Sequence, residues 1–332
     1  MRYLLFILLL ILFGAFPASA ATLKLATLAP EGSAWMTQMR EGAAEIKERT
    51  SGRVVIKLYG GGVMGNEKSM LRKIRIGQLQ GGAFTGGGLA EIYPDLRIYS
   101  LPLLFSSLAE VDHVRAELDP VLKAGLEQNG FVSFGFAEGG FALLMGNHPI
   151  TLLEHLKNQK LWVPEGDGVT AAVMQELGLS PITLPISDVL TGLQTGLVHI
   201  VGVSPIGALA FQWHTKVKYI TKAPMAYLFA TLAIDKGAFD KLSEADRQLV
   251  REVMERVYRR FDADNRADEQ VAIDALRRDG LTFVSPQPGE VEAMRQRAGK
   301  ALERLSAEGA FSPQMYNRVG ELVRAYRAQA PP

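Results

Sequence analysis

The chain has 332 residues, with 36 lysine and arginine residues against 35 aspartate and glutamate residues, and it contains no cysteine. A protein with so little net charge lacks the basic footprint that binds nucleic acids. The missing cysteines exclude disulfides, thiolate nucleophiles and cysteine-ligated zinc. Because 48% of the residues are hydrophobic and the length exceeds what one core usually supports, we expect two lobes.

The first twenty residues have the pattern of a secretory signal peptide. Arg2 gives a positive start, an apolar run covers 3–16, and small residues occupy 18–20. Fourteen helical residues would span only about 21 Å of a hydrocarbon core about 30 Å thick, which disfavours a membrane anchor. We therefore predict cleavage after Ala20 and a soluble, periplasmic mature protein.

Residues 21–140 predict a first lobe of alternating strands and helices. Ser33 is a suitable N-cap for a helix whose apolar residues recur at helical spacing, and Ser51 and Gly52 end that helix. Strands are expected at 23–28, 54–59, 81–85 and 131–136, and further helices at 67–76 and 108–128. This alternation is typical of an α/β lobe with a mainly parallel sheet.

Residues 141–225 repeat the alternation and predict a second α/β lobe. Helices are expected from about 152, at 169–177 and at 186–195, and strands at 160–164, 181–184 and 197–203. The apolar run 227–234 is expected to lead back to the first lobe, to which we assign 226–255. Two lobes joined by crossing strands leave a cleft between them, where small molecules usually bind.

A long helix and C-terminal helices complete the prediction. Ser243 to Asp246 form a capping box, and the helical pattern continues to Asp279. A helix of this length would reach about 55 Å, which exceeds one small lobe. We predict a brace across both lobes, then a linker at Pro286 and Pro288 and a helix at 291–306, so that 256–332 packs across the lobes.

Several local motifs that could indicate a cofactor site or a catalytic site are better explained as structural features. Residues 60–65 fit the dinucleotide pattern G-x-G-x-x-G, but the next expected strand is followed by glycines instead of an acid for the ribose. The five histidines lack zinc-protease spacing, and no G-x-S-x-G is present. Glu165 and Asp167 lie in a glycine-containing loop typical of turns. We expect no cofactor, no metal site and no enzymatic activity.

Several short motifs carry a resemblance to a known family. In chain order they are Gly77-Gln78-Leu79-Gln80, Leu101-Pro102-Leu103-Leu104-Phe105, Glu138-Gly139-Gly140-Phe141, Leu161-Trp162-Val163-Pro164 and Leu193-Gln194-Thr195-Gly196-Leu197-Val198. From about residue 21 to about 260, the chain resembles the DctP-type solute receptors of TRAP transporters. The resemblance implies a type II-like, two-lobed periplasmic binding protein that delivers an organic acid to small and large membrane subunits.

Three departures from the family pattern change the expected ligand. The arginine that usually clamps the substrate carboxylate is replaced by Trp162, a second common arginine by Ala142, and a common acid by His199. Burying a carboxylate without a cationic partner costs several kcal/mol. We therefore predict a variant that lacks the carboxylate clamp and binds a larger, more hydrophobic ligand, lipid-like or aromatic.

Carried over from the resemblance, the expected cleft is lined largely by aromatic residues. The candidate ligand contacts are Thr27, Trp35, Thr85, Gly86, Phe105, Glu138, Phe141, Trp162, Glu165, Pro205 and Trp213, with Tyr219 as a further aromatic candidate. An alternative interpretation is that Trp162 and Phe141 only pack the hinge.

The sequence favours one function and leaves three alternatives open. A receptor for TRAP membrane subunits is favoured, and a receptor subset with the same arginine losses implies a tetratricopeptide-repeat partner in the periplasm. The alternatives are a ligand sensor on the same fold, a dicarboxylate receptor that uses other cationic residues, and an exported enzyme.

Overall fold

The computed structural model describes residues 20–329, so the predicted signal peptide lies outside the described residues apart from Ala20. The first lobe alternates strands and helices as predicted. Its elements are β1 (Ala21–Ala26), α2 (Ala34–Arg49), β2 (Val54–Tyr59), α3 (Glu67–Arg75), β3 (Gly81–Thr85), η1 (Pro94–Ser100), α4 (Leu108–Gln128) and β4 (Phe131–Ser133). β1 pairs in parallel with β2 and β3. Ser33 caps α2 and Asn66 caps α3, because each side chain accepts a backbone N–H of the first turn.

The second lobe repeats the alternation with shorter elements. They are η2 (Leu153–Leu156), β6 (Lys160–Pro164), α5 (Gly168–Glu176), β7 (Ser180–Leu184), η3 (Ile186–Asp188), α6 (Val189–Thr195), β8 (Ile200–Val203), α7 (Pro205–Ala210), η4 (Trp213–Lys216) and β9 (Tyr219–Thr221). β6 pairs in parallel with β7 and β8. The helix predicted from about 152 is only the short η2, and α7 and β9 were not predicted.

Two ten-residue strands cross between the lobes, β5 (Ala137–Gly146) and β10 (Ala226–Asp235). β5 pairs with β10 along its first half and with β8 and β9 along its second half. One continuous sheet results, with the order β2-β1-β3-β10-β5-β8-β6-β7. The predicted parallel pairing holds inside each lobe, whereas the crossing strands are antiparallel to their neighbours.

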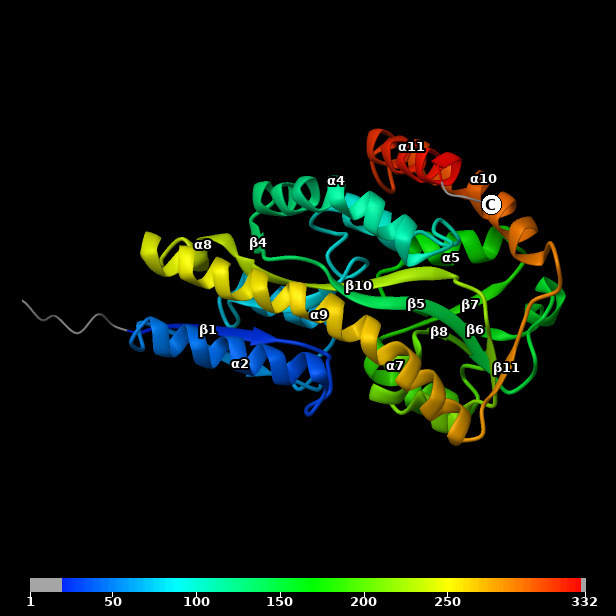
Figure 1. Cartoon of the computed structure of the whole chain (residues 1–332), viewed down its shortest axis with the longest axis horizontal. Helices are drawn as coiled ribbons and strands as arrows, with labels where there is room; N and C mark the ends of the chain where they lie inside the picture. Colours follow the sequence, from blue (N-terminus) through cyan, green and yellow to red (C-terminus); the bar gives the residue numbers. More distant parts are fainter. Residues whose placement is uncertain (1–19, 330–332) are drawn as a thin grey trace, which may run out of the picture.

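The long helix α9 (Glu244–Arg278) lies across both lobes, as predicted. Figure 1 shows it running diagonally along the whole molecule. Its first half places Val250, Val253 and Met254 in the core of the first lobe, and Leu276 near its end belongs to the core of the second. Its 35 residues span about 52 Å, enough to tie two lobes together.

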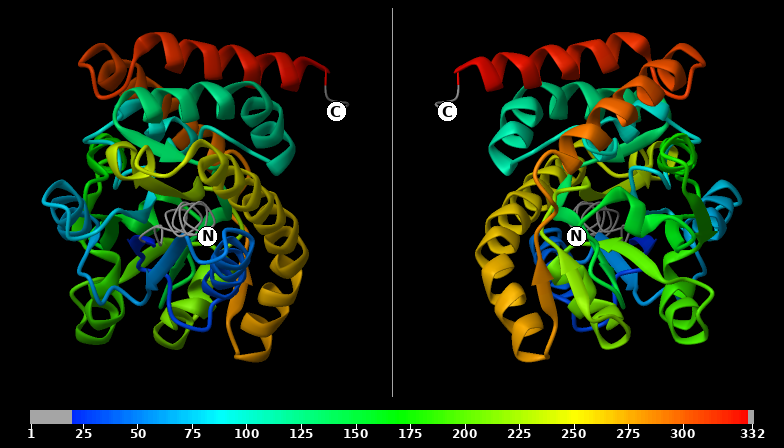
Figure 2. Two further views of the ribbon diagram at one scale, coloured as in Figure 1. Left: turned by 90° about the vertical axis from the view of Figure 1, so that its left-hand side faces the viewer. Right: turned by 90° about the vertical axis from the view of Figure 1, so that its right-hand side faces the viewer.

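The segment after α9 continues to connect the lobes. α8 (Lys236–Phe239) precedes α9. After α9 come β11 (Thr282–Val284), α10 (Glu290–Ala307) and α11 (Pro313–Gln329). β11 pairs with β9, α10 packs on α5 of the second lobe, and α11 lies over α4 of the first, as Figure 2 shows. More than one C-terminal helix was predicted for 256–332, but no bounds were predicted for α11. Among helices between residues 20 and 329, none combines the length and hydropathy needed to cross a bilayer.

Candidate ligand-binding cleft

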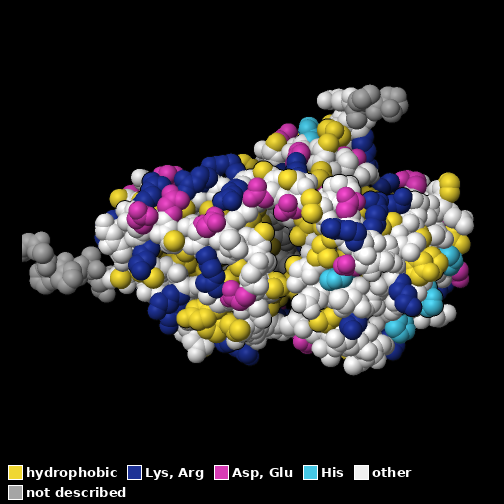
Figure 3. Space-filling model, turned by 60° about the horizontal axis from the view of Figure 1, so that its bottom comes forward, with side chains coloured by type: hydrophobic (Ala, Val, Ile, Leu, Met, Phe, Trp, Pro, Cys, Tyr) yellow, Lys and Arg dark blue, Asp and Glu magenta, His cyan; other side chains and the backbone are white. Residues whose placement is uncertain are grey.

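A cavity of about 790 Å³ lies between the lobes, and its lining includes residues at the carboxyl ends of parallel strands in both. Thr27 follows β1, Thr85 ends β3, Pro164 ends β6 and Ser204 follows β8, and all four line it. Figure 3 shows the surface hollowed between the two lobes, with hydrophobic side chains at the rim. Ligands of open α/β sheets typically bind at this end of the strands. The volume lies in the range of small-molecule sites.

The structure brings seven of the eleven candidate contacts together around this cavity. They are Thr27, Trp35, Thr85, Gly86, Glu138, Trp162 and Trp213. They come from both lobes and from the crossing strand β5. The cavity therefore has the interlobe position that was predicted.

The other four candidates lie outside the cavity lining. Phe105 and Phe141 pack edge-on against Tyr227, and Phe105 is only 2% exposed. Pro205 is buried at the first position of α7. Glu165 accepts a hydrogen bond from Asn66 Nδ2 at 2.7 Å. Aromatic residues occur both in the packed core and in the cavity lining, because both are apolar. Residue type alone therefore did not separate the two roles.

His199 and Tyr219 also lie outside the lining. His199 Nδ1 stands 3.5 Å from the backbone nitrogen of Lys160, and Tyr219 lies in β9. At residue 199, where the resemblance implies an acid, the chain therefore contributes no side chain to this cavity.

Trp162 and Trp213 form an aromatic wall on the second lobe. Their rings meet edge-on with centroids 5.0 Å apart, and Phe211 stacks on Trp213 at 5.4 Å. The Trp162 indole N–H donates to the carbonyl of Leu184 at 3.0 Å. Because that bond uses the only polar group of the indole, Trp162 presents a hydrocarbon surface where related receptors are expected to hold a carboxylate.

Every charged side chain in the lining is acidic. The five are Glu67, Glu138, Asp167, Asp264 and Asp268, and among residues 20–329 no lysine, arginine or histidine lines the cavity. A buried anion needs a charge-assisted partner, and a neighbouring carboxylate adds repulsion. The lining is therefore unfavourable for a carboxylate ligand.

Glu67 is one of the buried acids of the lining. It is 8% exposed, and Thr85 donates its backbone N–H at 2.6 Å and its hydroxyl at 3.1 Å to the two carboxyl oxygens. Burial raises the pKa of Glu67 to about 7, although the two hydrogen bonds oppose the shift. Burial also raises the pKa of Asp167, which caps α5 by accepting the N–H of Thr170 at 3.0 Å.

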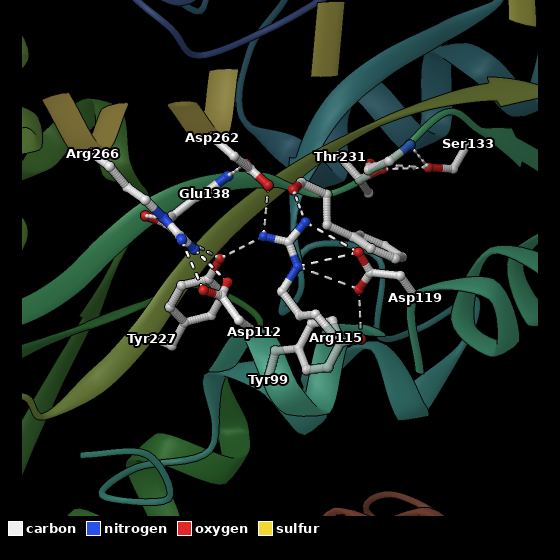
Figure 4. A network of polar contacts seen from close by, with 12 residues as sticks. Tyr99, Asp112, Arg115, Asp119, Ser133, Glu138, Tyr227, Thr231, Asp262 and Arg266 are labelled. Carbon is white, nitrogen blue, oxygen red and sulfur yellow. Dashed lines mark hydrogen bonds and ion pairs between the residues drawn. The ribbon is translucent and has the colours of Figure 1, made fainter. Parts of the chain in front are cut away.

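Glu138 is held by a polar network at the crossing strands, shown in Figure 4. Its side chain is 1% exposed, and Arg266 of α9 donates to both carboxyl oxygens while Tyr227 donates to one. Hydrogen bonds to Asp112 and Glu138 raise the pKa of Arg266 further. Glu138 therefore lines the cavity with its charge already compensated.

Arg115 is the other arginine of this network and is 11% exposed. It pairs with Asp119 at 3.1 Å and Asp262 at 2.9 Å, and it donates to the hydroxyl of Tyr227 and the carbonyl of Phe136. All of its partners are protein groups, and neither Arg115 nor Arg266 lines the cavity. Neither arginine is placed to hold a ligand carboxylate in this cavity.

A polar group in the lining of the cleft was missed by sequence reasoning. Gln38 of α2 donates from Nε2 to Asp264 of α9 at 2.8 Å, and Asn265 follows in the lining. Gln38 Oε1 and the indole nitrogen of Trp35 are buried without a hydrogen-bond partner among residues 20–329. Only the packing of α2 against α9 brings these residues together, so helical periodicity gave no signal for them.

Beside the cavity, the two lobes touch through a small polar contact that we call the interlobe latch. Glu165 of the second lobe binds Asn66 at 2.7 Å and pairs with Lys68 at 3.2 Å. Next to it, Gly87 lies so close to Asp167 that a Cβ at residue 87 would stand 3.5 Å from that side chain. These contacts join the two lobes beside the cavity.

Residues 20–329 contain no group of three or more histidine, aspartate or glutamate side chains placed to hold a metal ion. The chemical groups around the cavity are apolar side chains, carboxylates, amides and hydroxyls. This arrangement can enclose an organic molecule.

A family comparison agrees with this geometry. The family model described as bacterial extracellular solute-binding protein, family 7 (DctP) matches residues 25–308. The chain belongs to this family. The DctP-type resemblance predicted from the motifs is thereby confirmed, and the assignment to a variant lacking the arginine clamp stays a prediction.

Curated relatives of this family 7 chain are distant. The chain is 26% identical over 252 residues to the 2,3-diketo-L-gulonate-binding periplasmic protein YiaO of Escherichia coli, covering 72% of this chain and 74% of that protein. It is 25% identical over 215 residues to the C4-dicarboxylate-binding periplasmic protein DctP of Rhodobacter capsulatus, covering 62% and 63%. With several curated relatives, the match spans only 61% to 64% of their length.

Solved structures share the whole fold. The sugar acid binding protein of Advenella mimigardefordensis, in complex with galactonate, superimposes with a TM-score of 0.85 at 18% identity. The match covers 92% of this chain and 98% of that one. The two-lobed α/β fold is therefore confirmed for this chain.

Proposed function

We propose that this protein is an extracytoplasmic, periplasmic solute receptor that encloses a rather hydrophobic organic ligand between its lobes and delivers it to a TRAP-type membrane permease. The observation that carries the choice of ligand is the cavity lining, which is largely apolar and whose charged residues are all acids. Membership of the solute-binding family supports the receptor role.

The charge of the lining argues against the dicarboxylate alternative. A C4 dicarboxylate would bring two negative charges into a cavity that offers no lysine, arginine or histidine among residues 20–329 and whose lining includes Asp264 and Asp268. Glu138 is neutralised by Arg266, so that arginine has little remaining attraction for another anion. Relatives that bind dicarboxylates or sugar acids by name are only 25% and 26% identical to this chain.

Capture works through closure of the lobes. A ligand that touches Trp35 on the first lobe and Trp162 on the second makes all its contacts only when the lobes are together, and it therefore favours the closed state. The crossing strands β5 and β10 and the helix α9 connect the two lobes and provide the hinge. The permease subunits would recognise the closed form.

Binding assays on the purified mature protein test the ligand class. We expect the neutral fluorophore N-phenyl-1-naphthylamine to bind with micromolar affinity and succinate and galactonate not to displace it. Micromolar binding of succinate or galactonate would overturn the proposal. Native mass spectrometry of protein isolated from its own cells identifies a retained ligand.

Delivery is tested separately from binding. Reconstituted small and large membrane subunits are expected to take up the bound ligand only when this receptor is added. A periplasmic pull-down with the receptor as bait tests the tetratricopeptide-repeat partner, and a pull-down without any repeat protein would remove that partner from the proposal.

A further inference from the structure

The cavity extends beyond the interlobe cleft into the second lobe. Its lining includes Pro164 at the carboxyl end of β6, and also Leu156 and Leu179 beyond the amino ends of β6 and β7. β6 has five residues, which corresponds to about 16 Å of strand. The cavity therefore continues along the full length of the strands of this lobe.

This extension runs between α5 and one face of the sheet, and we call it the tail arm. Leu144, Leu161 and Ile200 lie on that face. They share a core cluster with Val173 of α5 and with Leu177, the C-cap of α5. All five line the cavity. The aromatic wall belongs to the cluster on the other face.

Two small residues keep the tail arm connected to the cleft. Ala142 of β5 and Gly202 of β8 both line the cavity, and a Cβ placed on Gly202 would lie 3.8 Å from the Cβ of Ala142. Larger side chains at either position would enter the space between the two parts of the cavity. The passage therefore depends on the small size of these residues.

The far end of the tail arm is closed by α10. Met294 of α10 is 6% exposed and lines the cavity. Arg297 and Arg304 hold α10 on α5, donating to the carbonyl of Glu176 at 3.3 Å and pairing with its carboxylate at 3.4 Å. The far end of the arm is thus covered by α10, and its lining there is apolar.

From this geometry we infer that the ligand is an elongated amphiphile, with a hydrocarbon tail in the tail arm and an uncharged polar head beside Gln38 and Asn265 in the cleft. This inference rests on the proposed function and specifies its ligand. The tail gains by leaving water for a compartment lined by leucine, isoleucine, valine and methionine. The head meets Gln38 and Asn265, and the acidic lining disfavours a carboxylate there.

Chain length provides the test. In displacement of N-phenyl-1-naphthylamine by 1-hexanol, 1-octanol, 1-decanol and 1-dodecanol, we expect the affinity of the wild-type protein to rise about fourfold per added methylene. Ala142→Leu is expected to stop that rise after the shorter alcohols and to weaken 1-dodecanol at least tenfold. Ala116→Leu adds the same bulk at an exposed position of α4, outside the cavity lining, and is the matched control, with an unchanged length dependence.

The outcomes separate this inference from the proposed function. If the fluorophore and all alcohols fail to bind, the hydrophobic receptor itself is wrong. If they bind but affinity does not rise with chain length, the receptor stands and the tail arm is refuted. Dodecanoate binding as tightly as 1-dodecanol would refute the uncharged head. Should Ala142→Leu not fold, Met294→Ala tests the far end, where a lengthened arm is expected to favour 1-tetradecanol over 1-dodecanol.

Discussion

Trp162 illustrates how one side chain sets the chemistry of this cleft. It is 6% exposed, its indole N–H is bonded to the carbonyl of Leu184, and its ring packs on Trp213. The residue does more than pack a hinge, because its surface also lines the cavity. At the position where related receptors are expected to carry a cation, this chain therefore offers only apolar contact.

Trp162→Arg tests that role. We expect the affinity for N-phenyl-1-naphthylamine to fall about 30-fold, because a buried aromatic contact worth about 2 kcal/mol is lost and a charge enters the cavity. Binding of succinate or another small acid is expected to become measurable by calorimetry. Trp162→Phe is the control and should keep most of the apolar affinity, and equal affinities for both variants would contradict the assigned role.

Glu67 makes stability depend on pH in an identifiable direction. Its pKa rises from 4.5 in the unfolded chain to about 7 in the fold, so the folded state holds the proton more tightly. The stabilising contribution is complete below pH 4.5 and is lost as pH rises through 7, a change of about 3 kcal/mol. Glu67→Gln keeps hydrogen-bond partners for Thr85 but cannot titrate.

Urea unfolding of wild type and Glu67→Gln at a series of pH values between 5 and 8 measures this effect. As pH rises, the free energy of unfolding of the wild type is expected to fall relative to that of the variant. Asp167 is present in both proteins, so it does not contribute to this difference. A constant difference across this range would show that Glu67 is not protonated in the fold.

At the scale of elements, the arginine network joins α4, β5, β10 and α9 where the lobes meet. Arg115 comes from α4, Tyr227 from β10, Glu138 from β5, and Asp262 and Arg266 from α9. The carboxylate of Asp262 also accepts the backbone N–H of Glu138 at 2.8 Å. The network therefore fixes α9 against the crossing strands.

Arg266→Met removes the main partner of a buried carboxylate. Because Glu138 is 1% exposed while Arg266 is 34% exposed, we expect a loss of about 2–3 kcal/mol in the free energy of unfolding. Adding Glu138→Gln should recover part of it. Arg260→Met is the matched control on the same helix, since Arg260 makes only exposed ion pairs and its loss should cost less than about 0.5 kcal/mol. Similar losses for both arginines would contradict this account.

At the scale of the whole molecule, the interlobe latch affects how long the lobes stay closed. Glu165 was predicted as a ligand contact, but it binds Asn66 and Lys68 across the cleft and lies outside the cavity lining. We therefore expect Glu165 to stabilise the closed state of the receptor.

Glu165→Ala is expected to raise the dissociation rate of N-phenyl-1-naphthylamine about three- to tenfold, since a hydrogen bond and an ion pair are lost only from the closed form. The melting temperature should barely change. Stopped-flow fluorescence measures the rate. Glu154→Ala removes an exposed pair with Lys157 in the same lobe and should leave the dissociation rate unaltered. Identical rates for the two variants would remove the latch from the mechanism.

Much of the fold was predictable from local sequence. β2, β3 and α4 have the predicted bounds, and α9 extends from its cap at Ser243 to within one residue of the predicted end. These elements carry strong apolar periodicity and clear capping residues, which act within a few residues of the chain. The short elements α7, β9 and β11 were missed because their patterns are brief, and the bounds of α11 were not predicted.

By itself, the sequence determined the alternation of elements, the two lobes, the brace and the absence of arginine at positions 162 and 142, because these follow from residue order and short-range periodicity. The tertiary structure decided which acids and aromatic residues reach the cavity, that Glu138 is neutralised by an arginine 128 residues away, and that a hollow continues beneath α5. These properties depend on packing between distant segments. A side chain of the same type fills a core at Phe105 and lines a cavity at Phe211, depending only on what the fold places beside it.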